Sequence, residues 1–187
     1  MKVRDYLKLN ECFQENFPNG RKELVTLLDY PDSSDGEKME VYKITDPRDG
    51  ADFEDARYNM GYGLRWPAAI VYAEKEDDVK DAIMCATKAG YNISPRGRGH
   101  SYQGLSLMDG HVVIDCSLLC NTDDFILDRT EGDWLLPGQK KIGSIKNGPG
   151  CTNAVMLAYA HKNFDAKEGA VYNIGTCPSV GIVGEYP

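Results

Sequence analysis

The chain has 187 residues, of which 42% are hydrophobic and 27% charged, a composition typical of a globular protein large enough to bury a core. Its net charge of −8 argues against nucleic acid as a partner, because binding to phosphate requires a basic surface. No apolar run is long enough to cross a membrane, and the first residues lack the apolar core of a signal peptide.

The first 66 residues are predicted to form an N-terminal segment that is helical at its start and irregular afterwards. Three apolar residues within it, Val25, Leu27 and Leu28, suggest a short helix. Residues 29–55 are acidic and rich in Pro, Gly, Asp and Ser, which indicates a long surface loop. We interpret the charge of this loop as that of an ordinary solvated surface.

A β-α-β unit is predicted at the start of the second region, residues 67–187. Residues 68–73 (AAIVYA) have the length and apolarity of a buried strand. The helical spacing that follows has acidic residues in its first turn and ends at Gly90, a residue type that commonly stops helices. Residues 91–94 then predict a second short strand, which ends at Pro95.

More strands and one further helix are predicted after this unit. Residues 111–116 (HVVIDC) have the pattern of a strand, and residues 121–150 that of short strands joined by turns. A helix is expected over residues 151–162, starting near Thr152 or Asn153. This mixture of elements, without internal repeats, predicts the α+β class.

A glycine-rich loop joins the second and third predicted strands, with the sequence RGRGHSYQG over residues 96–104. Glycines let backbone N–H groups approach a phosphate closely, while Arg96 adds charge and Ser101 a hydroxyl donor. The loop does not match the Rossmann fingerprint for dinucleotides, because no helix opens directly after it. From these residues alone, a plain polar turn is an equally good interpretation.

Three histidines and six cysteines are the other candidates for chemistry. His100 lies in the glycine loop, whereas His111 and His161 fall on a predicted strand and a predicted helix and are assigned ordinary structural positions. Cys116 and Cys120 are four residues apart but have no matching second pair, so the ligand set of a zinc site is missing. We therefore expect no metal.

Residues 67–119 resemble the first half of the FAD-binding domain of berberine-bridge-enzyme-like oxidases, a group within the vanillyl-alcohol oxidase superfamily that includes gluco-oligosaccharide oxidases. The shared order is strand, helix, strand, glycine loop, histidine and strand. Residues 173–184 (NIGTCPSVGIVG) resemble a later family segment, G-x-CPxVGxGGH. The resemblance implies an incomplete PCMH-type FAD-binding domain over residues 67–187, without its C-terminal FAD region and its substrate region.

The resemblance also implies FAD as the cofactor, attached at two points. In the family, the histidine of the glycine loop bonds to the flavin 8α-methyl carbon and the cysteine of the CPxVG motif bonds to C6, and His100 and Cys177 match these positions. A neutral imidazole and a thiolate are nucleophiles suited to such bonds. Without its motif, Cys177 would be interpreted as a small buried hydrophobe. The expected cofactor-binding residues are Arg96, Gly97, Arg98, Gly99, His100, Ser101, Tyr102, Gly104, Ser106, Cys177, Pro178, Val180 and Gly181.

Two further cysteines receive a role only through the resemblance. Family members carry a disulfide between a cysteine near the mature N-terminus and one in the helix before the histidine loop, and Cys12 and Cys85 match these places. Such a bond implies an oxidising compartment and therefore a secreted protein. No role is assigned to the other three cysteines, Cys116, Cys120 and Cys151.

The sequence departs from the family in three places. Arg98 stands where the family loop has its middle glycine. After Gly181 the sequence no longer follows the family's glycine-rich run. The catalytic base of the family, usually a tyrosine, belongs to the part of the chain beyond Pro187, so no catalytic residue is named.

The resemblance implies an enzyme that oxidises an alcohol or sugar hydroxyl by hydride transfer to the flavin, with dioxygen as the acceptor. The alternative is a truncated, non-catalytic flavin-domain fragment or a secreted interaction protein. The expected partners are a small alcohol or sugar substrate and dioxygen, without nucleic acid or membrane. A single glycosylation sequon, Asn92-Ile93-Ser94, supports secretion only weakly, because it falls in a predicted strand.

Overall fold

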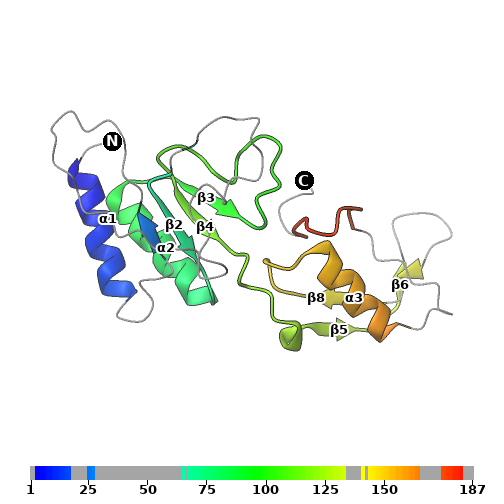
Figure 1. The fold of residues 1–187 in the computed structure, drawn as a ribbon. Helices are drawn as coiled ribbons and strands as arrows, with labels where there is room; N and C mark the ends of the chain where they lie inside the picture. The colour runs from blue at the N-terminus through cyan, green and yellow to red at the C-terminus, as the bar shows by residue number, and fades with distance from the viewer. Residues whose placement is uncertain are drawn as a thin grey trace. The chain divides into compact units, whose positions relative to one another are not determined.

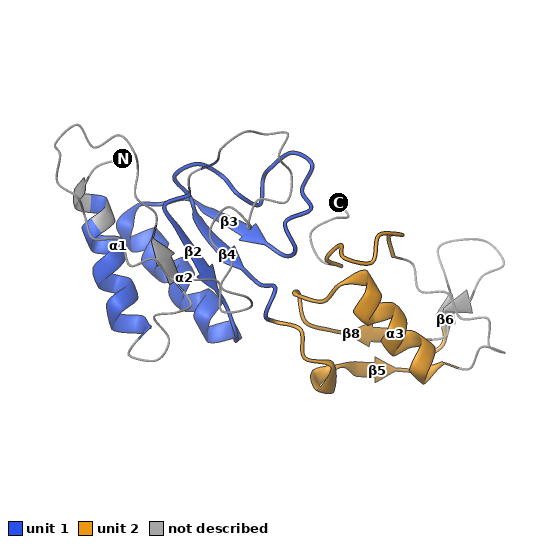
Figure 2. Cartoon of the chain, viewed as in Figure 1, with its two compact units in different colours: residues 1–118 blue, residues 119–187 orange. Residues whose placement is uncertain are grey.

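The computed structural model forms two compact units, residues 1–118 and residues 119–187 (Figure 2). The expected division into residues 1–66 and 67–187 stays a prediction, because most of the N-terminal segment, including the predicted acidic loop, lies outside the described residues. The structure describes residues 3–17, 25–27, 65, 67–133, 140–141, 143–164 and 174–182.

Unit 1 is built on a four-stranded sheet in the order β1-β2-β4-β3 (Figure 1). Strands β2, β4 and β3 are parallel to one another, and β1 is antiparallel to β2. The predicted β-α-β unit is confirmed, but its two strands are not neighbours, since β4 lies between them. The strands comprise Val25–Leu27 (β1), Ala69–Tyr72 (β2), Ile93–Arg96 (β3) and Val112–Asp115 (β4).

Helix α2 (Glu76–Ala89) forms where the helical spacing predicts it, and it packs against β4. The Asp78 carboxylate accepts hydrogen bonds from the backbone N–H groups of Glu74 and Lys75, at 3.0 and 3.1 Å, which ties the incoming chain to the first turn. Gly90 ends the helix in the left-handed conformation, with a φ of 78°, as the sequence predicts.

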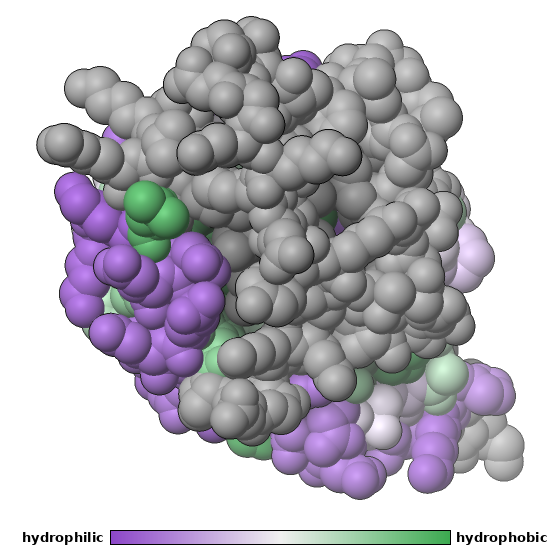
Figure 3. Space-filling model, turned by 60° about the vertical axis from the view of Figure 1, so that its left-hand side comes forward, coloured by the Kyte–Doolittle hydropathy of each residue, from purple (hydrophilic) through white to green (hydrophobic). Residues whose placement is uncertain are grey.

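A second helix, α1 (Val3–Asn16), lies against α2 and is joined to it by a disulfide between Cys12 and Cys85. This confirms the pairing that the family resemblance implies. The described surface visible in Figure 3 is mostly hydrophilic. No helix among the described residues combines the length and the apolarity that crossing a bilayer requires.

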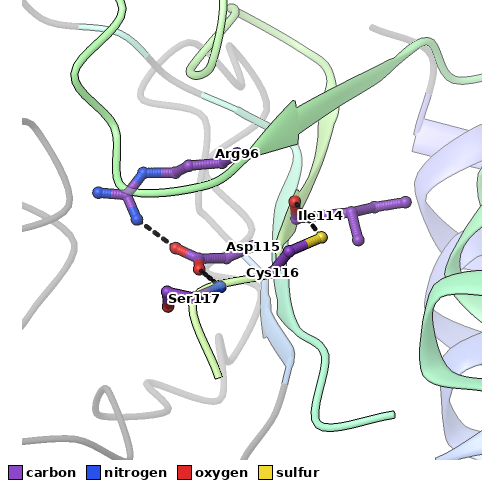
Figure 4. A network of polar contacts seen from close by, with 5 residues as sticks. All are labelled: Arg96, Ile114, Asp115, Cys116 and Ser117. Carbon is purple, nitrogen blue, oxygen red and sulfur yellow. Dashed lines mark hydrogen bonds and ion pairs between the residues drawn. The ribbon is translucent and has the colours of Figure 1, made fainter. Parts of the chain in front are cut away.

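The two faces of the sheet have different neighbours. Every residue of β2 and β4 is buried, as expected of strands covered on both sides. Ile70, Tyr72 and Val113 pack together with Leu107, which comes from the segment between β3 and β4. Figure 4 shows Ile114, the residue after Val113, pointing instead toward the helices. The helices therefore cover one face of the sheet, and the segment that contains the glycine loop covers the other.

The helix suggested by Val25, Leu27 and Leu28 is wrong for the residues described. Val25–Leu27 form strand β1, which pairs with β2 in antiparallel register, while Leu28 lies outside the described residues. A three-residue apolar run has no period that separates a helix from a strand, so pairing with a neighbouring strand decides its conformation.

Strand β3 starts later than predicted and continues through Pro95 to Arg96. Proline is tolerated because β3 lies at the edge of the described sheet. The carbonyls of Asn92 and Arg96 accept hydrogen bonds from β4 and the residue after it, so alternate residues face the neighbouring strand. Pro95, which has no N–H to donate, therefore faces the outer side.

Among its described residues, unit 2 contains short antiparallel strands and an α-helix, as the sequence predicts. Strand β5 pairs with β8, and β6 pairs with β7. The Thr152 hydroxyl accepts a hydrogen bond from the Val155 N–H and caps the helix at the predicted start. The elements are the 3₁₀ helix η4 (Thr122–Asp124), β5 (Ile126–Asp128), β6 (Gly132–Asp133), β7 (Lys140–Lys141), β8 (Ser144–Lys146) and α3 (Asn153–Asn163).

The core of unit 2 is built around a second disulfide. Cys120 and Cys151, separated by 31 residues, are bonded to each other, and Cys151 is fully buried beside Phe125 and Met156. This pairing was not predicted. With it, the cysteines among the described residues that form no disulfide are Cys116 and Cys177.

Candidate functional site

The C-terminal ends of β3 and β4 form the base of the glycine loop (Figure 4). Arg96 ends β3 and Asp115 ends β4, and the two residues are partners in register. Nη1 of Arg96 donates to Oδ2 of Asp115, in an ion pair whose side chains are 6% and 0% exposed. Parallel strands end at the same edge of a sheet. The ion pair therefore links the end of β3, where the glycine loop begins, to the end of β4.

Both carboxylate oxygens of Asp115 have partners. Oδ1 accepts a hydrogen bond of 2.8 Å from the backbone N–H of Ser117. A charge without exposed surface is stable only when it is paired and hydrogen-bonded, and Asp115 meets both conditions. Sequence reasoning missed this residue. An acidic side chain at the end of an otherwise apolar strand is the signal that could have revealed it.

Arg96 lies beneath the loop rather than on its surface. Its guanidinium is buried and held by Asp115, so its position is fixed by the sheet. A buried arginine in this position stabilises the loop by supporting its backbone on the sheet side. A contact between Arg96 and a cofactor phosphate stays a prediction.

The backbone of the loop packs directly on that guanidinium. Gly99 has a φ of +77°, and a Cβ placed there would lie 2.7 Å from Nη2 of Arg96. Glycine is therefore required at this position both by conformation and by space. No other residue type among those described has a positive φ, so Arg98 occupies its place in the loop without backbone strain. This explains why an arginine is tolerated where the family has a glycine.

Replacing Gly99 with alanine should destabilise unit 1 more than the same change at Gly110. Gly110 also has a positive φ, +67°, but a Cβ there would meet nothing within 4 Å. Gly110→Ala should cost about 1–2 kcal/mol for the left-handed conformation alone. Gly99→Ala should cost about 1–3 kcal/mol more, because the guanidinium must shift within its buried ion pair. Chemical denaturation of both variants measures the difference, and equal losses would contradict the packing described.

The part of the loop after His100 forms a turn that presents an aromatic side chain to solvent. The Ser101 hydroxyl accepts a hydrogen bond of 3.2 Å from the Leu105 N–H, and the Ser101 carbonyl accepts one from the Gly104 N–H. Tyr102, inside this turn, is 84% exposed, whereas His100 is half-buried. Ser101 thus shapes the turn, and Tyr102 is free to contact a bound molecule.

In unit 2, the start of α3 holds the segment that carries Cys177. The buried Asn153 side chain donates to the carbonyls of Gly175 and Cys177, at 3.2 and 2.9 Å. The backbone N–H groups of Asn153 and Ala154 donate to the carbonyls of Val180 and Pro178. These helix N–H groups have no partner inside their own helix, so binding the segment satisfies them. No sequence pattern indicated this role for Asn153.

The anchored segment leaves the Cys177 thiol exposed. Its Sγ lies 3.4 Å from the Ser179 Oγ. The interpretation of Cys177 as a buried hydrophobe is therefore wrong, and the thiol is accessible to a partner. Gly181 closes the segment by bridging to Thr152.

The two thiols outside the disulfides, Cys116 and Cys177, should differ strongly in reactivity. Burial, and then the nearby charge of Asp115, raise the pKa of the Cys116 thiol, so less of it is thiolate at any given pH. In the cofactor-free chain at pH ~8, iodoacetamide should modify Cys177 well before Cys116. Modification of Cys116 should accelerate as the pH rises beyond the ordinary thiol pKa. Peptide mass spectrometry measures both rates, and equal rates would contradict the assignment.

Comparison with known proteins agrees with this geometry. A family model described as an FAD binding domain matches residues 67–136, which include β2, α2, β3, the glycine loop and β4. Xylooligosaccharide oxidase of Thermothelomyces thermophilus is 30% identical over 121 residues, which are 63% of this chain and 20% of that protein. Glucooligosaccharide oxidase of Sarocladium strictum is 26% identical over 140 residues, or 73% of this chain and 24% of that protein.

The same architecture occurs in solved structures. BBE-like 1 from Physcomitrella patens aligns over 93% of this chain and 29% of its own, with a TM-score of 0.57 and 22% identity. Residues 67–136 therefore match an FAD-binding domain, and the chain shares the fold of part of a berberine-bridge-enzyme-like protein. The chain spans about a fifth of the length of these curated relatives.

The expected cofactor-binding residues of this FAD domain fall into two groups. Arg96 to Ser106 belong to unit 1, where the structure brings Arg96 and Gly99 into contact. Cys177 to Gly181 belong to unit 2, where they are held at the start of α3. Cofactor contact by either group stays a prediction. His111 of this domain instead contacts Ser94, with 2.9 Å between Nδ1 and Oγ.

Proposed function

We propose that this chain supplies the two covalent attachment points of an FAD, His100 and Cys177, in an oxidase that acts on an alcohol or carbohydrate hydroxyl with dioxygen as acceptor. When bound, the flavin would accept a hydride from the substrate. The observation that carries the proposal is the exposed Cys177 thiol on a firmly anchored segment, together with the family match over residues 67–136. The names of the relatives, xylooligosaccharide and glucooligosaccharide oxidases, favour a carbohydrate as substrate.

The residues present fit such a cofactor. Gly99 and Gly104 have positive φ values of 77° and 69°, and this conformation turns successive backbone N–H groups toward a common side, where an anion can bind. His100 follows Gly99 directly, so the packing of Gly99 on Arg96 fixes the backbone from which the imidazole extends. In unit 2, Asn153 fixes the carbonyls on either side of the Cys177 thiol in the same manner.

Secretion is part of the proposal. Disulfides persist in oxidising compartments and are rare in the cytosol. Four of the six cysteines are paired in the structure, as Cys12–Cys85 and Cys120–Cys151. These two pairs support a protein that folds in the secretory pathway.

Acid precipitation of the protein, produced with FAD available, tests the attachment. Yellow colour should stay in the pellet of the wild type. It should also stay with His100→Ala or with Cys177→Ala, since one bond remains, and should be lost to the supernatant with both substitutions together. Cys116→Ser is the matched control and should behave like the wild type. A folded, colourless wild-type chain would contradict the proposal and favour a non-catalytic fragment or a secreted interaction protein.

A further inference from the structure

We propose that Asn92 carries an N-linked glycan and that this glycan covers the outer edge of strand β3. Asn92-Ile93-Ser94 is the one Asn-x-Ser/Thr sequence in the 187 residues, so the chain has a single acceptor for this modification. The proposal goes beyond the flavin function, and it rests on the secretion proposed above.

The structure places Asn92 just before a strand rather than inside one. Helix α2 ends at Ala89 and β3 begins at Ile93, so Asn92 lies in the connection between them. Its side chain is exposed. Its backbone carbonyl accepts a hydrogen bond of 2.9 Å from the Val112 N–H. The backbone is thus fixed by the sheet while the amide group remains open to a substituent.

The third residue of the sequon indicates when the modification occurs. Ser94 is only 2% exposed, and its Oγ lies 2.9 Å from Nδ1 of His111. An enzyme that must contact the whole sequon cannot reach Ser94 once β3 has joined β4. The oligosaccharide must therefore be transferred before this part of the sheet closes, as the chain enters the secretory pathway.

The transfer requires a lipid-pyrophosphate-linked oligosaccharide as co-reactant. The Asn92 amide nitrogen forms a bond to C1 of the first sugar and gives up one proton. The bond between C1 and the pyrophosphate oxygen breaks, and the lipid pyrophosphate leaves with its electron pair. The two disulfides of the described chain fit the compartment in which this reaction takes place.

A glycan at this position would protect a sheet edge. Among the described strands, β3 has a partner on one side only, which leaves backbone groups open to pairing with another chain. Pro95 already removes one donor from that edge. Ile93, the other residue of β3 that faces outward, is adjacent to Asn92. A glycan at Asn92 would therefore shield the part of the edge that the proline leaves open.

Secretion of the full chain from a eukaryotic host, behind the leader peptide of that host, tests the site. The intact mass of the wild type should exceed the mass of the polypeptide and fall after treatment with peptide N-glycosidase F. Asn92→Gln and Ser94→Ala should both abolish the shift. Asn10→Gln, outside any sequon, is the control and should keep it. Secreted, disulfide-bonded wild type with the unmodified mass would overturn the proposal.

Light scattering tests the role at the edge. Wild-type protein treated with the glycosidase, and Asn92→Gln, should both form larger species with rising concentration, while the glycosylated wild type should not. The glycosidase acts on chains that have already folded, so it separates edge exposure from a folding defect of the variant. Equal sizes in all three samples would overturn the shielding role.

Discussion

Replacing Asp115 with alanine should lower the free energy of unfolding of unit 1 by about 3–5 kcal/mol. The substitution leaves the guanidinium of Arg96 6% exposed and without the carboxylate that pairs with it. It also removes the acceptor of the Ser117 N–H. Chemical denaturation followed by circular dichroism, which reports on α1 and α2, measures the loss.

The chain offers a matched control for this experiment. Arg65 and Asp109 form another arginine–aspartate pair, at 3.2 Å, but their side chains are 31% and 49% exposed. Asp109→Ala should cost less than about 1 kcal/mol, because water replaces the lost partner. The double variant Arg96→Met/Asp115→Leu should recover much of the stability that Asp115→Ala loses, since neither of these two positions then carries a buried charge. A loss at Asp115 no larger than that at Asp109 would contradict the burial described.

Removing the disulfide between α1 and α2 should have an effect of similar size. The bond closes a loop across 73 residues, and the double variant Cys12→Ala/Cys85→Ala should lose about 4 kcal/mol through the greater entropy of its unfolded state. Alanine is the suitable replacement because both positions are buried and alanine adds no polar group to them.

Cys116→Ala is the control for this change, because its half-buried thiol is free. It should shift the midpoint of chemical denaturation far less than the double variant does. Denaturation curves recorded without reducing agent measure both effects. If the double variant unfolds at the wild-type denaturant concentration, the disulfide does not hold α1 on α2 in solution.

Elements with a strong local signal were predictable from the sequence. Strands β2 and β4 are apolar runs, and α2 combines helical spacing with acidic residues at its start and Gly90 at its end. Helix α3 begins at the predicted cap, Thr152. In each case the residues that determine the element lie within it or next to it, so no knowledge of the remaining fold is needed.

Features that depend on distant partners could not be predicted from local sequence patterns, although the family resemblance implied the Cys12–Cys85 pair. The pairing of Cys120 with Cys151 and the ion pair of Arg96 with Asp115 join residues whose proximity only the folded chain creates. Strand β1 forms because its residues pair with the edge of β2. The same holds for Asn153, whose amide reaches a segment more than twenty residues further along the chain. Sequence patterns identify side chains that are capable of chemistry. The contacts between such side chains depend on the topology of the fold.

The central position of β4 has a consequence for how the protein folds during synthesis. Strands β2 and β3 are made first but do not pair with each other, because each pairs with β4. The parallel sheet therefore cannot form until residue 115 has left the ribosome. Pairing between strands that are far apart in the sequence also slows folding. Arg96 meets Asp115 only at that moment, so the loop that carries His100 is fixed in the same step that completes the sheet.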